Sequence, residues 1–243
     1  MYQLLLAKEA VLDKKQLKQY LAKLASDNVI RETSDLNTYP IPRLLDNYEY
    51  IYLVYTLLNE HVKLGIPIHP AGEWLLDNYY LIENTVRIIQ KNLNKEKYKK
   101  FPGIETGNYA GFARVFVLAN EIVASTDGRI DEEELKEYLK AYQTQKNLFM
   151  DEIWNLGLFL EISIIEKIRC ILEKVFSSQM QKYKVENIVE RIIENKEKQK
   201  IKLNTDLYPF IEYMSYRLRA YGQKGMPYLN ILEEQVKKRG MTV

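Results

Sequence analysis

The chain has 243 residues, of which 35 are lysine or arginine and 33 are aspartate or glutamate, so its formal net charge is only +2. Because the two signs of charge nearly cancel, the chain has no strong overall positive potential that would attract nucleic acid. Hydrophobic residues make up 47% and charged residues 28%, which is typical of a soluble globular protein. Cys170 is the only cysteine, which excludes an internal disulfide and fits a reducing compartment.

Apolar residues recur every three or four positions along most of the chain, which is the spacing of one buried helix face. Asp13 and Asp151 are predicted N-caps, Pro70 suits a first helical turn, and Asp131 with Glu134 predicts a capping box. The pattern predicts an all-α fold, an irregular multi-helix bundle of roughly eight helices. The predicted helices are Leu12–Leu24, Leu44–Val62, Pro70–Asn92, Gly111–Ala124, Asp131–Tyr142, Asp151–Phe176, Gln179–Asn195, Leu207–Tyr221 and Pro227–Arg239.

The segment 28–42 is polar and ends in Tyr39-Pro40-Ile41-Pro42, where each proline disfavours helix at the residue before it. We therefore expect an extended linker there. Elsewhere no composition shift marks a boundary, so residues 1–243 are expected to form a single all-helical module. The most apolar window, Ile153 to Ile165, contains polar interruptions and is shorter than the roughly 20 residues that cross a bilayer.

The stretch AGEWLLDNYY (71–80) places polar groups inside an otherwise apolar predicted helix. Trp74, Asp77 and Asn78 are three or four residues apart, and Glu73 lies one turn before Asp77, so they share a helix face. One interpretation is a sugar site, because Trp can stack on a pyranose while Asp and Asn bind its hydroxyls. A glycosidase-like pair of Glu73 and Asp77 is also conceivable, but nothing selects a sugar ring between them.

The other interpretation of this stretch is a buried polar network that fixes helix packing. Arg114 or Arg87 would neutralise the acids, and Glu121 would join the network. We favour this interpretation because interior polar residues more often satisfy each other than bind ligands. It predicts that Trp74 is buried.

No metal or cofactor site is predicted. The stretch VASTDGRIDEEE (Val123–Glu134) imitates a calcium loop, but its first position is Val123, which has no side-chain oxygen. A helix stop at Gly128 and an N-cap at Asp131 explain the same residues. The only histidines, His61 and His69, have no zinc-ligand spacing, and no glycine-rich phosphate loop is present. No catalytic residue is therefore assigned.

A lysine-rich stretch follows the third predicted helix. Its side chains are suited to anionic lipid headgroups or to an acidic partner surface, although lysines at a helix end are also typical of a solvated surface. The two interpretations stay open. The residues are Lys91, Lys95, Lys97, Lys99 and Lys100.

Several segments carry a family resemblance. They are PAGEWLLDNYYLIE (70–83), GFARVFVLANEIVASTDGRIDEEELKEYLKAYQ (111–143) and EIWNLGLFLEISIIEKIR (152–169). In this order and spacing they resemble the N-terminal region of cyclic β-1,2-glucan synthases. The tail, QKYKVENIVERIIENKEKQK (181–200) with YPFIEYMSYRLRAYG (208–222), resembles the clostridial-type members.

The resemblance implies a place in a longer membrane protein. Family members carry a glycosyltransferase domain between transmembrane helices, which polymerises glucose from UDP-glucose, and a phosphorylase-like module downstream. Neither module is matched here, and no catalytic residue carries over, so the chain is expected to be a non-catalytic fragment. The implied role is to scaffold the membrane-bound transferase at the cytoplasmic face of the cell membrane. The alternatives are a module that holds the growing β-1,2-glucan chain and an independent enzyme that acts on glucosides.

Overall fold

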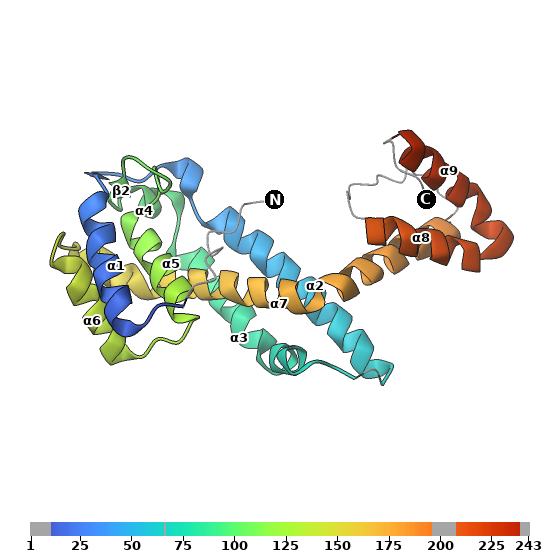
Figure 1. The fold of residues 1–243 in the computed structure, drawn as a ribbon, viewed down its shortest axis with the longest axis horizontal. Helices are drawn as coiled ribbons and strands as arrows, with labels where there is room; N and C mark the ends of the chain where they lie inside the picture. The colour runs from blue at the N-terminus through green and yellow to red at the C-terminus, as the bar shows by residue number, and fades with distance from the viewer. Residues whose placement is uncertain (1–10, 66, 196–207, 239–243) are drawn as a thin grey trace. The chain divides into compact units, whose positions relative to one another are not determined.

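Helices dominate the structure, a computed structural model that describes residues 11–65, 67–195 and 208–238 (Figure 1). The all-α prediction is confirmed. In the described ranges the α-helices are α1 (Lys14–Asp27), α2 (Ile41–Lys63), α3 (Pro70–Asn92), α4 (Lys95–Lys99), α5 (Arg114–Thr126), α6 (Glu132–Gln143), α7 (Met150–Asn195), α8 (Tyr208–Ala220) and α9 (Met226–Lys238). Short 3-10 helices span Leu36–Thr38 (η1) and Gly222–Lys224 (η2), and two-residue strands span Ile30–Arg31 (β1) and Gly103–Ile104 (β2).

The N-caps predicted at Asp13 and Asp131 are confirmed. The N-cap predicted at Asp151 is wrong, because α7 begins at Met150 and Asp151 lies inside its first turn. The Asp13 carboxylate accepts a hydrogen bond from the backbone N–H of Gln16, whose side chain accepts in turn from the N–H of Asp13. At α6 the Asp131 carboxylate accepts from the N–H of Glu134 at 2.7 Å. These bonds satisfy donors that the first helical turn leaves without a partner.

The differences from the prediction that matter most concern α2, the predicted linker and α7. Helix α2 begins at Ile41 with Pro42 in its first turn, because a proline there has no N–H to lose. The predicted linker 28–42 contains β1 and η1, and Ile30 pairs with Ile104 in an antiparallel ribbon. Helix α7 continues without a break to Asn195, whereas two helices were predicted over this range. The serines after Phe176 do not end the helix, because serine is a weak helix former and not a helix breaker. The lysine-rich stretch also contains the short helix α4.

Two compact units divide the chain, Met1–Lys174 and Val175–Val243. In the first unit, α5 lies in the centre, with every one of its 13 residues buried. Helix α1 packs against α6, and α2 packs against α3. The rings of Phe101 and Phe116 lie 5.3 and 5.7 Å from that of Phe159 on α7, so aromatic packing ties α7 to the core.

Two buried ion pairs fix α7 against its neighbours in the first unit. Arg43 on α2 donates from Nε to Glu166 Oε2 at 2.7 Å. Arg114 on α5 binds both carboxylate oxygens of Glu152, at 2.8 and 2.6 Å. A buried charge without its partner is strongly destabilising, so the two pairs select one rotation of α7.

The second unit has a core of its own. Glu186 on α7 accepts hydrogen bonds from the Tyr213 hydroxyl at 2.5 Å and from Arg217 Nε at 2.8 Å, which joins α7 to α8. The buried apolar residues come from α7, α8 and α9. They are Val185, Val189, Ile192, Ile211, Met214, Leu218, Leu229, Leu232 and Val236.

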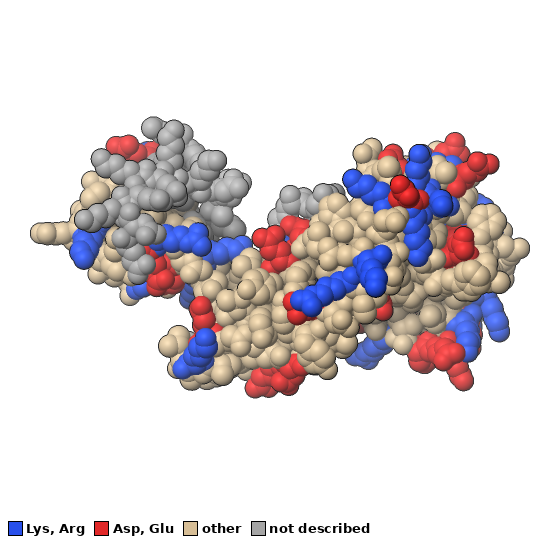
Figure 2. Space-filling view, turned by 180° about the vertical axis from the view of Figure 1, so that it is seen from behind, with Lys and Arg blue, Asp and Glu red and all other residues tan. Residues whose placement is uncertain are grey.

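Charged side chains of both signs are interspersed on the face that Figure 2 displays, with broad uncharged areas between them. This distribution agrees with the small net charge. Among the helices that the structure describes, none is long and apolar enough to span a bilayer.

Candidate functional site

An open groove lies in the first unit where the start of α3 and the end of α5 meet α7. We call it the α3–α7 groove. Its volume is about 350 Å³, and its lining is mostly apolar, with one acidic and one basic side chain. The lining residues are Ala71, Trp74, Asp127, Gly128, Ile164, Lys167, Ile168, Ile171 and Leu172.

Trp74 is placed at the groove by the way α3 packs. Helix α3 buries Leu75, Ile82, Val86 and Ile89, whereas Trp74 lies beside this stripe and is 48% exposed. The prediction that Trp74 is buried is therefore wrong. An apolar residue beside the buried stripe of a helix can be buried or exposed. Which of the two holds for Trp74 depends on the side of α3 against which α2 packs.

The polar side chains of the groove are bonded to each other. Lys167 Nζ lies 2.6 Å from Asp127 Oδ1. The hydrogen bond from Lys167, and then its positive charge, hold the pKa of Asp127 below its usual value. Asp127 ends α5 in the left-handed conformation (φ 55°), followed by Gly128 (φ 78°), so this is the helix stop that the sequence predicted.

The six residues of the predicted polar network do not come together. Glu73 and Asp77 are exposed on α3, and the Asn78 amide donates to the carbonyl of Trp74 at 2.8 Å. Arg114 and Glu121 lie buried on α5 instead. The network as a single site is therefore absent from the part of the chain that the structure describes.

Arg114 and Glu121 have other partners. Arg114 binds Glu152 and donates to the carbonyl of Asn147 at 2.9 Å, while Glu121 accepts from the Tyr109 hydroxyl. Burial alone would lower the pKa of Arg114, but the hydrogen bonds and charge of Glu152 outweigh it and raise that pKa. The predicted pairing of Arg114 with the acids of α3 is wrong. The sequence signal for Glu152 was an acid at the start of an apolar helix, which does not reveal its partner.

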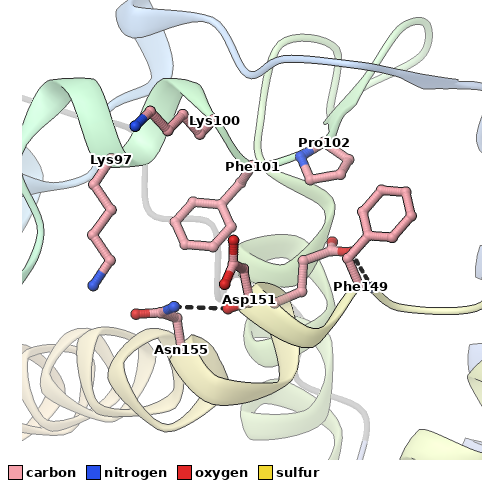
Figure 3. Close-up of a pocket in the computed structure, with 8 residues that line it drawn as sticks. Lys97, Lys100, Phe101, Pro102, Phe149, Asp151 and Asn155 are labelled. Atoms are coloured by element: carbon pink, nitrogen blue, oxygen red, sulfur yellow. Dashed lines mark hydrogen bonds between the residues drawn. The ribbon is translucent and has the colours of Figure 1, made fainter.

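A second hollow lies between α4 and the start of α7, and we call it the α4–α7 cavity (Figure 3). Its volume is about 360 Å³. In Figure 3, Lys97 and Lys100 lie on the α4 side and Asp151 and Asn155 on the α7 side, with the Phe101 ring between them. The lining residues are Lys97, Lys100, Phe101, Pro102, Phe149, Asp151, Glu152 and Asn155.

Three lining residues of this cavity make local hydrogen bonds. Lys97 Nζ donates to the carbonyl of Asn92 at 3.1 Å, and the Asn155 amide donates to the carbonyl of Asp151 at 2.7 Å. The Glu152 carboxylate accepts from the N–H of Phe149 at 2.8 Å in addition to its bonds with Arg114. The cavity is thus walled by lysines on one side and by the first turns of α7 on the other.

Two of the five lysines of the predicted interaction surface line this cavity. Lys91 lies in the last turn of α3, and Lys95 and Lys99 are the end residues of α4. Lys97 and Lys100 line the cavity. All but Lys97 are exposed. The structure therefore brings Lys97 and Lys100 next to the start of α7, which the sequence did not predict.

His69 and Cys170 carry side chains of types that are often used in catalysis. His69 caps α3, where its Nδ1 accepts a hydrogen bond from the N–H of Ala71. Burial raises the pKa of the Cys170 thiol, which disfavours the reactive thiolate. Across the described residues, no group of three or more His, Cys, Asp or Glu side chains is placed to hold a metal ion.

Comparison with known proteins finds a distant relative. No protein-family model matches the chain. Over 206 residues it is 25% identical to the cyclic beta-(1,2)-glucan synthase NdvB of Rhizobium meliloti (strain 1021). The match covers 82% of this chain and 7% of that protein, so the chain spans only a small part of its relative's length. The similarity supports a distant relationship with such synthases. It carries no subgroup information, so the clostridial assignment stays a prediction.

Proposed function

We propose that this chain is a non-catalytic helical module that docks onto the other modules of a cyclic β-1,2-glucan synthase-like protein. Its relative is a synthase, and the match accounts for 7% of that protein. Under this proposal, glucan synthesis belongs to segments outside the match, and the present chain supports them. The membrane-bound transferase of the same polypeptide is the proposed partner.

The observation that carries the proposal is the exposed apolar surface at the α3–α7 groove. Trp74 on α3 and Ile164 and Ile171 on α7 line the groove and are exposed. Leu81 and Ile88 are also exposed on α3, at a spacing of seven residues from Trp74, but they lie outside the groove lining. A seven-residue spacing keeps side chains on one helix face. Exposed apolar side chains gathered at one groove favour a protein partner, and a helix laid in a groove is a recurrent solution.

A second candidate function is a glucan contact at the same groove. It is favoured by the exposure of Trp74, whose indole face could stack on a sugar, with Glu73 and Asp77 exposed on the same helix. The polar lining of the groove weighs against it, because Asp127 and Lys167 already bind each other. Sugar hydroxyls need several available donors and acceptors, so docking is the better-supported proposal.

Titration calorimetry with linear β-1,2-glucan separates the two functions. We expect no saturable heat for the wild-type chain, and no glucose transfer or hydrolysis when UDP-glucose and a divalent metal are added. Trp74→Ala is the variant and Trp154→Ala the matched control, since both tryptophans are exposed. If the wild-type chain binds glucan saturably and only Trp74→Ala loses this binding, the function of the groove is glucan binding and not docking. Metal-dependent glucosyl transfer by the chain would sink the non-catalytic role.

Site-specific photocrosslinking tests docking directly. The chain would replace the matched segment of the Rhizobium meliloti synthase, with a photoreactive amino acid at position 171 in the groove or at position 64. Leu64, at the end of α2, is exposed but does not line the groove. We expect crosslinks from position 171 to segments outside this chain and none from position 64. Equal crosslinking from both positions, or none from 171, would argue against docking through the groove.

A further inference from the structure

A cluster of large apolar side chains is exposed at the start of α7. Phe149 is 63% exposed, Met150 60%, Ile153 39% and Trp154 74%. All four lie within the six-residue segment 149–154, and two of them carry aromatic rings. Such a concentration of exposed apolar surface marks an interaction site rather than an ordinary solvated helix end.

The apolar cluster lies beside the lysines of α4. Phe149 lines the α4–α7 cavity together with Lys97 and Lys100, and Figure 3 shows both lysines across the cavity from the first turns of α7. Residues 91–100 contain five lysines and one acid, Glu96. Of the acids at the start of α7, Glu152 is buried and neutralised by Arg114, which leaves Asp151 exposed. The local balance is therefore positive.

We infer that Phe149, Met150, Ile153 and Trp154, with Lys97 and Lys100, form a contact site for an anionic lipid bilayer. Aromatic side chains favour the boundary between headgroups and acyl chains, and exposed apolar residues flanked by lysines are typical of peripheral membrane attachment. The lysines add attraction to anionic headgroups. An acidic protein partner would contact the lysines, but it would give no role to the exposed side chain of Trp154. None of these residues lines the α3–α7 groove, so the inference is independent of the docking proposal.

The tryptophan content permits a direct test. The chain has two tryptophans, Trp74 and Trp154, so Trp74→Phe leaves Trp154 as the sole reporter. Vesicles of equal parts phosphatidylcholine and phosphatidylglycerol should sediment this protein and shift its tryptophan emission to the blue. Added salt should weaken the binding, because surface charges are screened. Vesicles of phosphatidylcholine alone should bind this protein more weakly than the anionic vesicles, by a factor of about ten or more.

Matched variants separate this site from general attraction of a basic protein. Lys97→Gln with Lys100→Gln should weaken binding to the anionic vesicles roughly tenfold. Lys15→Gln with Lys23→Gln, which makes the same charge change at exposed positions of α1, should not. Trp154→Ala should also weaken binding, whereas Leu64→Ala should not. Absence of sedimentation, equal effects of the two lysine pairs, or binding without a shift of Trp154 emission would overturn the inference.

Discussion

Trp74 and Phe159 are both large aromatic residues, but they have opposite surroundings. Trp74 is about half exposed at the groove, whereas Phe159 is fully buried between Phe101 and Phe116. We therefore expect Trp74→Ala to lower the free energy of unfolding by less than about 2 kcal/mol, because only about half of its surface leaves water on folding. Phe159→Ala should lower it by about 3–5 kcal/mol, because it opens a cavity in the core.

Urea unfolding of the two variants beside the wild type measures this difference. The slope of the unfolding free energy against urea should stay unchanged in Trp74→Ala, which would show that the change is local. A loss above about 2 kcal/mol in Trp74→Ala would show that its ring stabilises the core as a buried residue does. In that case the groove would be a packing feature.

The sequence predicted the chemistry of these residues better than their partners. Arg114 stands in the apolar run RVFVLANEIV, so a buried charge that needs a partner could be predicted. Its partner, Glu152, lies 38 positions away on α7. Glu73 and Asp77 were equally plausible partners from sequence alone. Only the packing of α5 against α7 decides between them.

At the scale of elements, Gly157 is an unusual residue in α7. It lies inside the helix, is exposed, and an added Cβ would meet no atom within 4 Å. We expect Gly157→Ala to raise the free energy of unfolding by about 0.5–1 kcal/mol, because alanine loses less backbone entropy than glycine in a helix. The melting temperature, followed by circular dichroism, should rise accordingly.

Gly128 provides the matched control for this substitution. It also has open space around its Cβ position, but its φ is +78°. Alanine is strained in that region by roughly 1–2 kcal/mol, so Gly128→Ala should be destabilising. A destabilised Gly157→Ala would indicate that α7 is bent or contacted at that position in solution.

Most helices could be predicted because an apolar stripe and a cap are local features. The bounds of α3, Pro70–Asn92, agree with the prediction, since Pro70 marks its start and the stripe continues to its end. Helix α4 was missed because five residues contain too little periodicity to recognise. The continuity of α7 was missed because the polar residues after Phe176 resemble a loop in the sequence. This interval contains no glycine or proline, and only the tertiary contacts show that the helix continues through it.

At the scale of the whole molecule, each compact unit is stabilised by its own contacts. The ion pairs of Arg43 with Glu166 and of Arg114 with Glu152 both lie within residues 1–174. In the second unit, Glu186 binds Tyr213 and Arg217. The sequence contains no glycine- or proline-rich boundary between them, because the units share α7. That residues 1–243 fold as a single module therefore remains a prediction.

A chain that ends at Lys174 tests whether the first unit folds by itself. It keeps the aromatic contacts of Phe159 and both buried ion pairs. We expect it to unfold in one cooperative thermal transition, because small compact domains with a complete core are usually two-state. Circular dichroism and amide hydrogen exchange would measure the transition and the protection of α5.

A chain that ends at residue 160 is the matched control, because it keeps Glu152 and Phe159 but loses Glu166. Arg43, which is nearly buried, would then have no carboxylate partner. Leaving one member of a buried pair uncompensated costs about 3–5 kcal/mol, which is a large part of the roughly 5–15 kcal/mol that stabilises a typical domain. The shorter chain should therefore lose its cooperative transition while the 174-residue chain keeps it. If both chains unfold non-cooperatively, the second unit is required for the first to fold, and residues 1–243 behave as one module.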